Sequence, residues 1–181
     1  TLTIETDDRL AAKNITAGGN ATLNAGAELS AKDMNVGGDL NAKAKNITAN
    51  NVTGKGNAVL TADKNVTLAG AFSAKNNAVL TAGETATLGG KTDVGETLTA
   101  NVGRDFVTNG AVTTGKELIA TVGNDAVTNG IVTTNGTLKW NVGNDLTTNA
   151  AVLSHGTTTI DAQNVKLSAD LMSDKNLTIT A

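Results

Sequence analysis

Three nearly identical stretches follow one another along this chain at a fixed interval of twenty residues. NVGRDFVTNGAVTT begins at residue 101, TVGNDAVTNGIVTT begins at residue 121, and NVGNDLTTNAAVLS begins at residue 141. A short unit repeated at a fixed interval is typical of solenoids, propellers and other architectures in which each unit packs on its neighbours. The repeat therefore limits the fold more than any other feature of the sequence.

Columns of identical residues appear when the chain is written in rows of twenty. They contain Gly83, Gly103, Gly123 and Gly143; Val102, Val122 and Val142; Asp105, Asp125 and Asp145; and Asn109, Asn129 and Asn149. Upstream, AVLTADKNVTL at 58–68 matches AVLTAGETATL at 78–88, and KNIT occurs at 13–16 and again at 45–48. The repeat thus extends through the whole chain, with a period of about 17 to 20 residues.

Apolar residues alternate with polar ones inside each unit. The pattern is seen in Leu98, Ala100 and Val102 and in the matching triplets of the next two units. Alternation is typical of a strand with one buried face, and the abundant Thr and Val favour strands. Frequent Asn, Gly and Asp would interrupt every turn of a helix. We therefore predict an all-β chain without helices.

A unit of two or three short strands cannot bury its apolar face alone, so it must stack on copies of itself. Stacking in register predicts a parallel β-helix (β-solenoid) of about nine coils, with strands about 4.8 Å apart. Tandem β-sandwiches need repeats near 100 residues and propeller blades need about 40, which this chain lacks. The nonapeptide calcium roll needs successive GGxGxDxUx units, whereas GGD at 37–39 and GG at 89–90 stand alone.

Composition and charge exclude several classes of protein. The 181 residues include no Cys and no Pro, and only 2% are aromatic, so small residues must fill the core. A net charge of −3 without a basic stripe argues against nucleic acid as a partner. No run of eighteen apolar residues and no leader-like segment occurs, so we expect neither stable membrane insertion nor an export signal within these residues.

A recurring pattern of Lys, Asn or Arg, then Asn or Asp, an apolar residue and Thr, followed by Asn-Gly and further apolar residues, is seen in KNITAGG (13–19), GRDFVTNGAVTT (103–114) and GNDLTTNAAVLS (143–154). It resembles the haemagglutinin-type repeats of filamentous haemagglutinin and of contact-dependent growth inhibition exoproteins, which belong to the two-partner-secretion proteins. The resemblance covers the whole chain.

This resemblance implies a right-handed β-helical shaft, exported through an outer-membrane two-partner-secretion transporter of a Gram-negative bacterium. The secreted, cell-surface fibre would act as an adhesin or virulence factor, touching host or neighbouring cells through other parts of the protein. Without proline the chain lacks the family's secretion motif, and no repeat-free toxin region follows. We therefore expect residues 1–181 to be one internal shaft segment, completed at its ends by adjoining shaft or by end-to-end self-association.

The Asp105, Asp125 and Asp145 column is the strongest candidate for chemistry. Stacking would place these carboxylates roughly 5 Å apart, which suits a calcium ion or the acidic cluster of a β-helical carbohydrate-active protein. The same column is expected to hold other Asx residues in other coils, namely Asn14, Asn46, Asn65, Asn164 and Asn176. Asp and Asn both make local turn hydrogen bonds, so we favour a structural role and predict no metal, cofactor or catalytic residues.

Other conspicuous residues also have structural interpretations. The Asn109, Asn129 and Asn149 column, followed by Gly or Ala, indicates either a turn with positive φ or an interior amide ladder. Trp140 is predicted to be a core plug rather than a sugar platform, and Phe72 and Phe106 are predicted to be core. His155 is predicted to be a solvated turn residue, and Arg104 could pair with one Asp only.

The residues bear differently on three possible functions. A structural shaft needs only regular coils, which this chain has. A carbohydrate-active enzyme on a β-helix needs long loops that build a cleft, and the repeat leaves no room for them. An ice-binding solenoid needs Thr-x-Thr in every coil, whereas Thr97 and Thr99 are replaced in the next row by Glu117 and Ile119. We therefore predict a structural module that is not an enzyme.

Overall fold

The computed structural model describes all residues from Thr1 to Ala181, and every regular element in it is a strand. The strands are β1 (Leu2–Thr6), β2 (Arg9–Ala17), β3 (Ala21–Ala25), β4 (Glu28–Val36), β5 (Leu40–Gly54), β6 (Ala58–Leu68), β7 (Phe72–Ala74), β8 (Ala78–Ala82), β9 (Ala86–Leu88), β10 (Thr92–Val94), β11 (Leu98–Val102), β12 (Phe106–Thr108), β13 (Val112–Thr114), β14 (Leu118–Val122), β15 (Ala126–Thr128), β16 (Val132–Thr134), β17 (Leu138–Val142), β18 (Asp145–Thr148), β19 (Val152–Ser154), β20 (Thr158–Asp161), β21 (Asn164–Leu167), β22 (Leu171–Ser173) and β23 (Leu177–Thr180). None of the regular elements is a helix that could cross a membrane.

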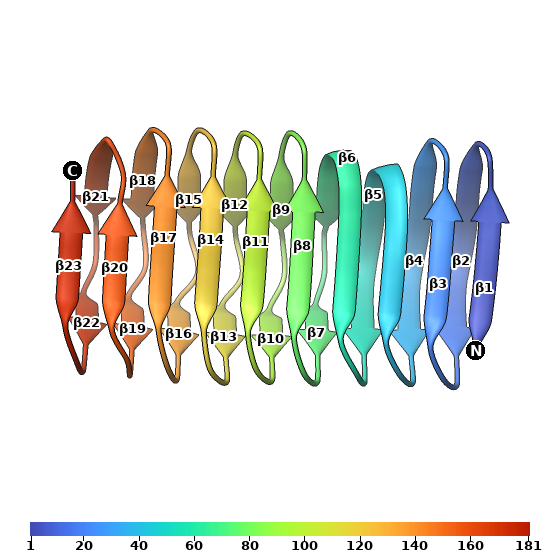
Figure 1. Cartoon of the computed structure of the whole chain (residues 1–181), viewed down its shortest axis with the longest axis horizontal. Coiled ribbons are helices and arrows are strands. Elements are labelled where there is room, and N and C mark those ends of the chain that lie inside the picture. Colours follow the sequence, from blue (N-terminus) through green and yellow to red (C-terminus); the bar gives the residue numbers. More distant parts are fainter.

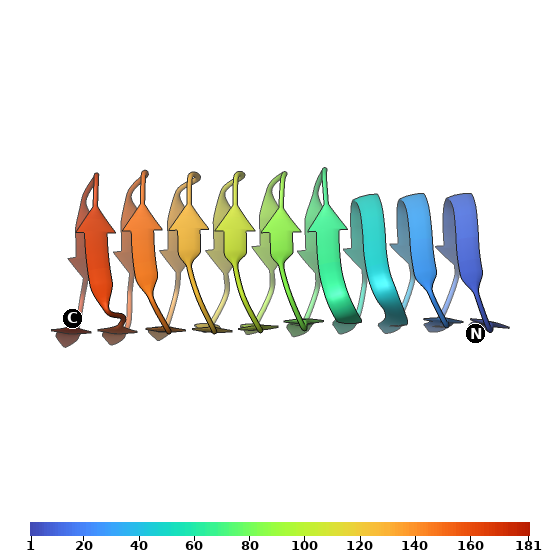
Figure 2. The same ribbon diagram turned by 90° about the horizontal axis from the view of Figure 1, so that it is seen from above.

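The coils contribute strands to three faces. From β7 onward each coil has a separate strand on each face, whereas β2, β4 and β6 each continue around one corner and β5 continues around two. In the coil of β11, β12 and β13, these strands lie on what we call the first, second and third faces, and the turns after them are the first, second and third corners. The first face is in the foreground of Figure 1, where its strands run upward and the chain returns behind them while advancing toward the C-terminus. A chain that runs up the near side and down the far side while it advances in this direction forms a right-handed β-helix. Figure 2 shows the coils from above as a row of similar loops.

All neighbouring coils pair in parallel, and the register is regular except for one shift between Ala44 and Asn46 of β5. Leu118, Ala120 and Val122 lie opposite Leu138, Trp140 and Val142, as the alternation predicts. The interval between paired residues is 20 through the middle of the chain, as in Leu98 with Leu118, and falls to 18 between Leu40 and Ala58. The prediction of a right-handed parallel β-helix of about nine coils is confirmed.

One continuous core runs along the axis and contains 45 buried hydrophobic residues, mostly Ala, Val and Leu. Trp140 is 2% exposed and lies between Ala120 and Ile160 of the adjacent coils, so the small Ala120 leaves room for the indole. Phe72 and Phe106 are buried as well. All three aromatic residues therefore fill the core, as the sequence predicts.

The core also contains threonines, which the sequence analysis did not place there. Six of these side chains have a buried hydroxyl without a hydrogen-bond partner; they are Thr92, Thr108, Thr114, Thr128, Thr148 and Thr158. Thr108, Thr128 and Thr148 form one inward column on the second face. An unpaired buried hydroxyl is destabilising. This column therefore makes the free energy of unfolding smaller than a column of apolar side chains of the same shape would.

Glycines at the corners permit the close approach of successive coils. A Cβ on Gly110 would collide with the carbonyl of Gly90, and one on Gly130 would collide with the carbonyl of Gly110. No residue of the chain has a positive φ. The positive φ expected at the Asn-Gly turns is therefore wrong: these positions need glycine because the backbone of the next coil occupies the space of a side chain.

Candidate functional site: polar ladders at the corners

The Asp column lies along the first corner, where it forms a ladder between coils. Asp105 Oδ1 accepts a 2.7 Å hydrogen bond from Asn124 Nδ2, and Asp125 Oδ1 accepts one of 2.9 Å from Asn144 Nδ2. The backbone N–H of Asp145 also donates to Asp125 Oδ1, at 3.1 Å. Each carboxylate thus binds groups of the following coil, so the local turn bonds expected from the sequence are not the ones that form.

The first-corner column contains some, but not all, of the Asn residues expected to lie in line with Asp105, Asp125 and Asp145. Asn46 and Asn65 pair with each other, and Asn164 pairs with Asp145, so these three residues do belong to the first corner. Asn14 pairs with Asp33 at the second corner. Asn176 precedes β23 at the third corner, because Leu177 pairs with Thr158. The assignment of Asn14 and Asn176 to the Asp column is therefore wrong, since all three corners use similar residues.

The surroundings of the Asp column offer no enclosed site. Arg104 Nη2 lies 3.9 Å from Asp105 Oδ2 and is mostly exposed. No group of three or more His, Asp or Glu side chains is placed to hold a metal ion. The three hollows of the structure do not include Asp105, Asp125 or Asp145. The geometry supports chain stacking and shows no substrate groove over these carboxylates.

A second ladder runs along the second corner. Asn129 Nδ2 donates a 2.9 Å hydrogen bond to Asn109 Oδ1, and Asn149 Nδ2 donates one of 2.7 Å to Asn129 Oδ1. All three side chains are exposed. The amide ladder considered in the sequence analysis does form, but it lies on the outside of the turn and not within the core.

A third ladder at the third corner was missed by the sequence analysis. Asp39 Oδ1 accepts hydrogen bonds from the backbone N–H and the side-chain amide of Asn57, at 2.7 and 3.0 Å. Asn20 and Asn77 extend the ladder on either side. Its signal was present as an Asx residue directly before each of the first-face strands β3, β5, β6 and β8, but its 18- and 19-residue intervals concealed it among rows of twenty.

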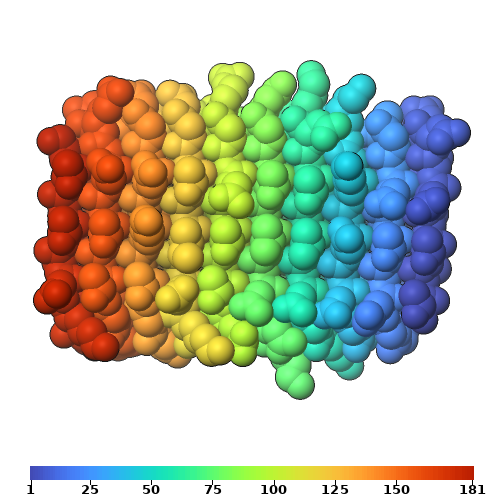
Figure 3. Space-filling model, in the orientation of Figure 1, coloured from blue at the N-terminus to red at the C-terminus, as the bar shows by residue number.

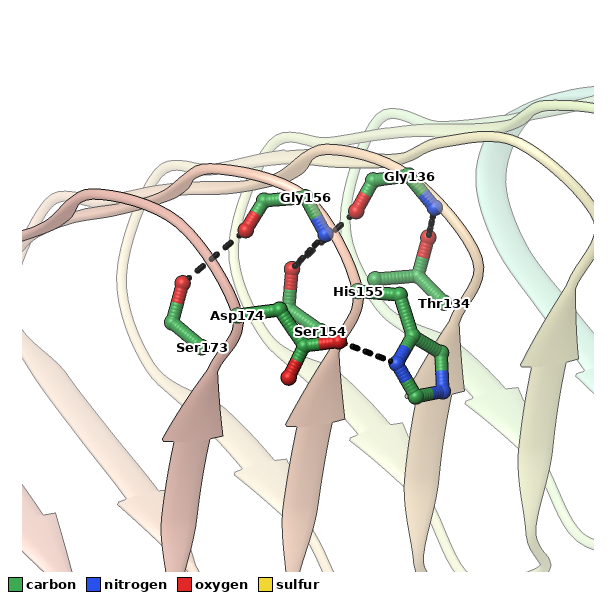
Figure 4. A network of polar contacts seen from close by, with 7 residues as sticks. All are labelled: Thr134, Gly136, Ser154, His155, Gly156, Ser173 and Asp174. Carbon is green, nitrogen blue, oxygen red and sulfur yellow. Dashed lines mark hydrogen bonds and ion pairs between the residues drawn. The ribbon is translucent and has the colours of Figure 1, made fainter.

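His155 lies at the third corner beside two serines and an aspartate (Figure 4). Its Nδ1 is 2.7 Å from Asp174 Oδ2 of the next coil, and both side chains are exposed. The hydroxyl of Ser154 donates to the Gly136 carbonyl, and that of Ser173 donates to the Gly156 carbonyl. Because both hydroxyls are directed to backbone carbonyls, these residues do not form a Ser-His-Asp catalytic arrangement.

The largest hollow is an open, polar depression of about 610 Å³ at the first corner of the N-terminal coils. Its charged lining residues are Glu5, Asp7, Lys43, Lys45 and Asp63. The only apolar hollow is a core void of about 10 Å³ beside Trp140 and Phe106. Neither combines the concave apolar lining and convergent polar groups that are typical of a small-molecule site.

The fold and the ladders define the chain as a parallel β-solenoid with hydrogen-bonded corners. A scan against protein-family models found no match, and comparisons with curated proteins and with solved structures found none.

Proposed function

We propose that residues 1–181 are a stiff shaft segment of a large exported surface fibre, which holds a binding or toxin domain away from the cell. One observation carries this proposal: every coil has 18 to 20 residues between paired positions, with no inserted loop at any corner. Regular coils joined by parallel backbone pairing and by corner hydrogen bonds make a rod, whereas a catalytic β-helix needs irregular loops that build a cleft.

The contacts of each coil also suit export as an unfolded chain. Each strand pairs only with the preceding and following coils, so folding can propagate coil by coil as the chain leaves a narrow pore. The absence of Cys means that no disulfide closes before passage. These features fit an outer-membrane two-partner-secretion transporter as the export partner, with the fibre displayed on a Gram-negative cell.

The export step can be tested with one engineered disulfide. Thr67 and Thr87 are paired outward residues of adjacent coils, and a parallel pairing about 4.8 Å apart lies within the Cα separation of a disulfide. We expect Thr67→Cys with Thr87→Cys to block surface display under oxidising conditions and to permit it in reductant. Either single cysteine is the matched control. Full display of the oxidised double variant would contradict export as an unfolded chain.

The spacer role can be tested by deleting one coil from the full-length protein. Removal of residues 98–117 lets Leu118 stack on Ala78, because both pair with Leu98. We expect normal display, unchanged distal binding or toxin delivery, and a fibre shorter by about 4.8 Å. Removal of residues 98–107 alone breaks the register and should abolish display. Normal display with lost binding after the whole-coil deletion would show that this segment holds a binding site itself.

A further inference from the structure

The first face carries an uncharged rectangle of outward side chains in four successive coils. Outward residues occupy the second and fourth positions of each first-face strand, and most of the rectangle consists of β-branched residues. Its members, which we call the central patch, are Val59, Thr61, Val79, Thr81, Thr99, Asn101, Ile119 and Thr121. Figure 3 shows this face, on which side chains form regular rows along the axis. β-Branched side chains have few rotamers to lose, so the patch is well suited to docking.

Charged residues lie on both sides of the central patch: Lys43 is one coil before it, Lys139 is one coil after it at a second position, and Asp161 is two coils after it. Lys43 and Asp161 both occupy fourth positions, both are exposed, and neither takes part in an ion pair of its own chain. The fourth-position column runs, coil by coil, through Lys43, Thr61, Thr81, Asn101, Thr121, Asn141 and Asp161. Lys43 therefore lies three coils before Asn101, and Asp161 lies three coils after it.

We propose that the first face docks antiparallel on the first face of a second copy of this chain, about a twofold axis that runs along β11. Under this axis, each fourth-position residue faces a fourth-position residue of the partner. The coils of the partner run in the opposite order. Lys43 then meets the partner's Asp161, and Asp161 meets the partner's Lys43. Two ion pairs close the ends of the interface. At its centre the outward residues of β8, β11 and β14 meet one another, while Val59 and Thr61 of the central patch meet the partner's Lys139 and Asn141.

Other arrangements of the two faces lose this complementarity. When the axis moves one coil toward the N-terminus, along β8, Glu5 lies opposite the partner's Asp161 and like charges meet. When it moves one coil toward the C-terminus, along β14, Asp161 faces Thr81 and gains no ionic partner. A parallel arrangement places Lys43 opposite Asn41 and Asp161 opposite Thr159. Lys139 gains no ionic partner in any of these arrangements. Only the axis along β11 pairs both Lys43 and Asp161, so these two charges select this register.

The size of the contact predicts a weak dimer. Seven coils about 4.8 Å apart, with strands of five residues rising about 3.3 Å each, form a rectangle of about 30 by 16 Å. Two such rectangles bury roughly 1,000 Å², at the lower limit of specific interfaces. Exposed ion pairs add little affinity. The dimer should therefore form at high protein concentration or where shafts are crowded side by side.

Charge reversal tests the proposal by sedimentation over a wide concentration range. Lys43→Asp or Asp161→Lys alone creates two like-charge contacts, and we expect each to weaken dimerisation by about tenfold or more. The combined reversal restores both pairs and should return the affinity to within about threefold of the original. Lys166→Asp on the second face is the control and should change nothing. Circular dichroism establishes that every variant is folded.

Spin labels test the register directly, because the chain has no other cysteine. In the antiparallel dimer, the distance between labels on the two copies is shortest at Asn101→Cys, longer and equal at Thr81→Cys and Thr121→Cys, and longer still at Thr61→Cys. Equal distances at all four positions would indicate the parallel arrangement and overturn the proposal. It would also be overturned by a chain that stays monomeric at every concentration, or by open-ended polymers insensitive to the charge reversals, which would indicate end-to-end association.

Discussion

The side-chain amide of Asn144 donates a 2.9 Å hydrogen bond to the carboxylate of Asp125, one coil earlier in the chain. The same Oδ1 atom accepts the backbone N–H of Asp145. Similar bonds join Asn124 to Asp105 and Asn164 to Asp145. At Asp105 and Asp125 one acceptor atom therefore binds the next coil twice. An Asn oxygen can take the same place, since Asn65 Oδ1 accepts the backbone N–H of Thr85.

Asp125→Asn should change the free energy of unfolding by less than about 1 kcal/mol, because the amide oxygen still accepts both hydrogen bonds and one of three stacked charges is removed. Asp125→Ala removes the acceptor and should cost about 1 to 2 kcal/mol. Urea unfolding of both variants at neutral pH measures the difference. Equal losses in the two variants would show that the carboxylate charge matters and the acceptor does not.

Calcium should leave the melting temperature of the chain unchanged. Asp105, Asp125 and Asp145 each use Oδ1 for the ladder, and a hard cation needs six or more oxygen ligands from a flexible site. Thermal unfolding with calcium and with a chelator measures the effect, and magnesium serves as a comparison. A calcium-dependent rise that Asp125→Asn abolishes would assign these carboxylates to a cation site.

The sequence predicted the fold because alternation and period each have a direct physical meaning. Leu118, Ala120 and Val122 face inward since successive strand residues point to opposite sides, and they stack on the next triplet since the interval is constant. The corners were harder to predict. Asn14 and Asn176 were placed in the wrong column because intervals of 18 and 19 residues change the phase, and Asx residues occupy all three corners.

The side-chain partners at the corners could not be predicted either. A local turn bond and a bond to the next coil use the same residue types, and only the backbone path decides between them. Buried threonines were missed for a related reason. In a three-residue strand such as β15, the Thr at its end is equally compatible with a solvated corner and with the core.

Thr128→Val should stabilise the chain. The Thr128 hydroxyl is buried without a partner, and a methyl group of similar shape removes its desolvation cost, for a gain of about 1 kcal/mol. Thr134→Val is the matched control, because the Thr134 hydroxyl donates a 2.9 Å hydrogen bond to the Lys116 carbonyl. That variant should lose about 1 kcal/mol. Denaturant unfolding compares the two, and a loss of stability in Thr128→Val would show that its hydroxyl has a partner.

Gly123→Ala should destabilise the coils around it, because a Cβ at this position would overlap the carbonyl oxygen of Gly103 in the preceding coil. The coils must then separate locally, and we expect a cost of about 1 to 3 kcal/mol, as for other overpacked sites. Gly18→Ala is the control, since a Cβ there meets nothing within 4 Å. It should be neutral or stabilising by up to about 1 kcal/mol, because alanine restricts the unfolded chain. Thermal unfolding measures both variants. Equal stability of the two would mean that close stacking at the first corner does not require glycine, and that its recurrence at residues 83, 103, 123 and 143 has another cause.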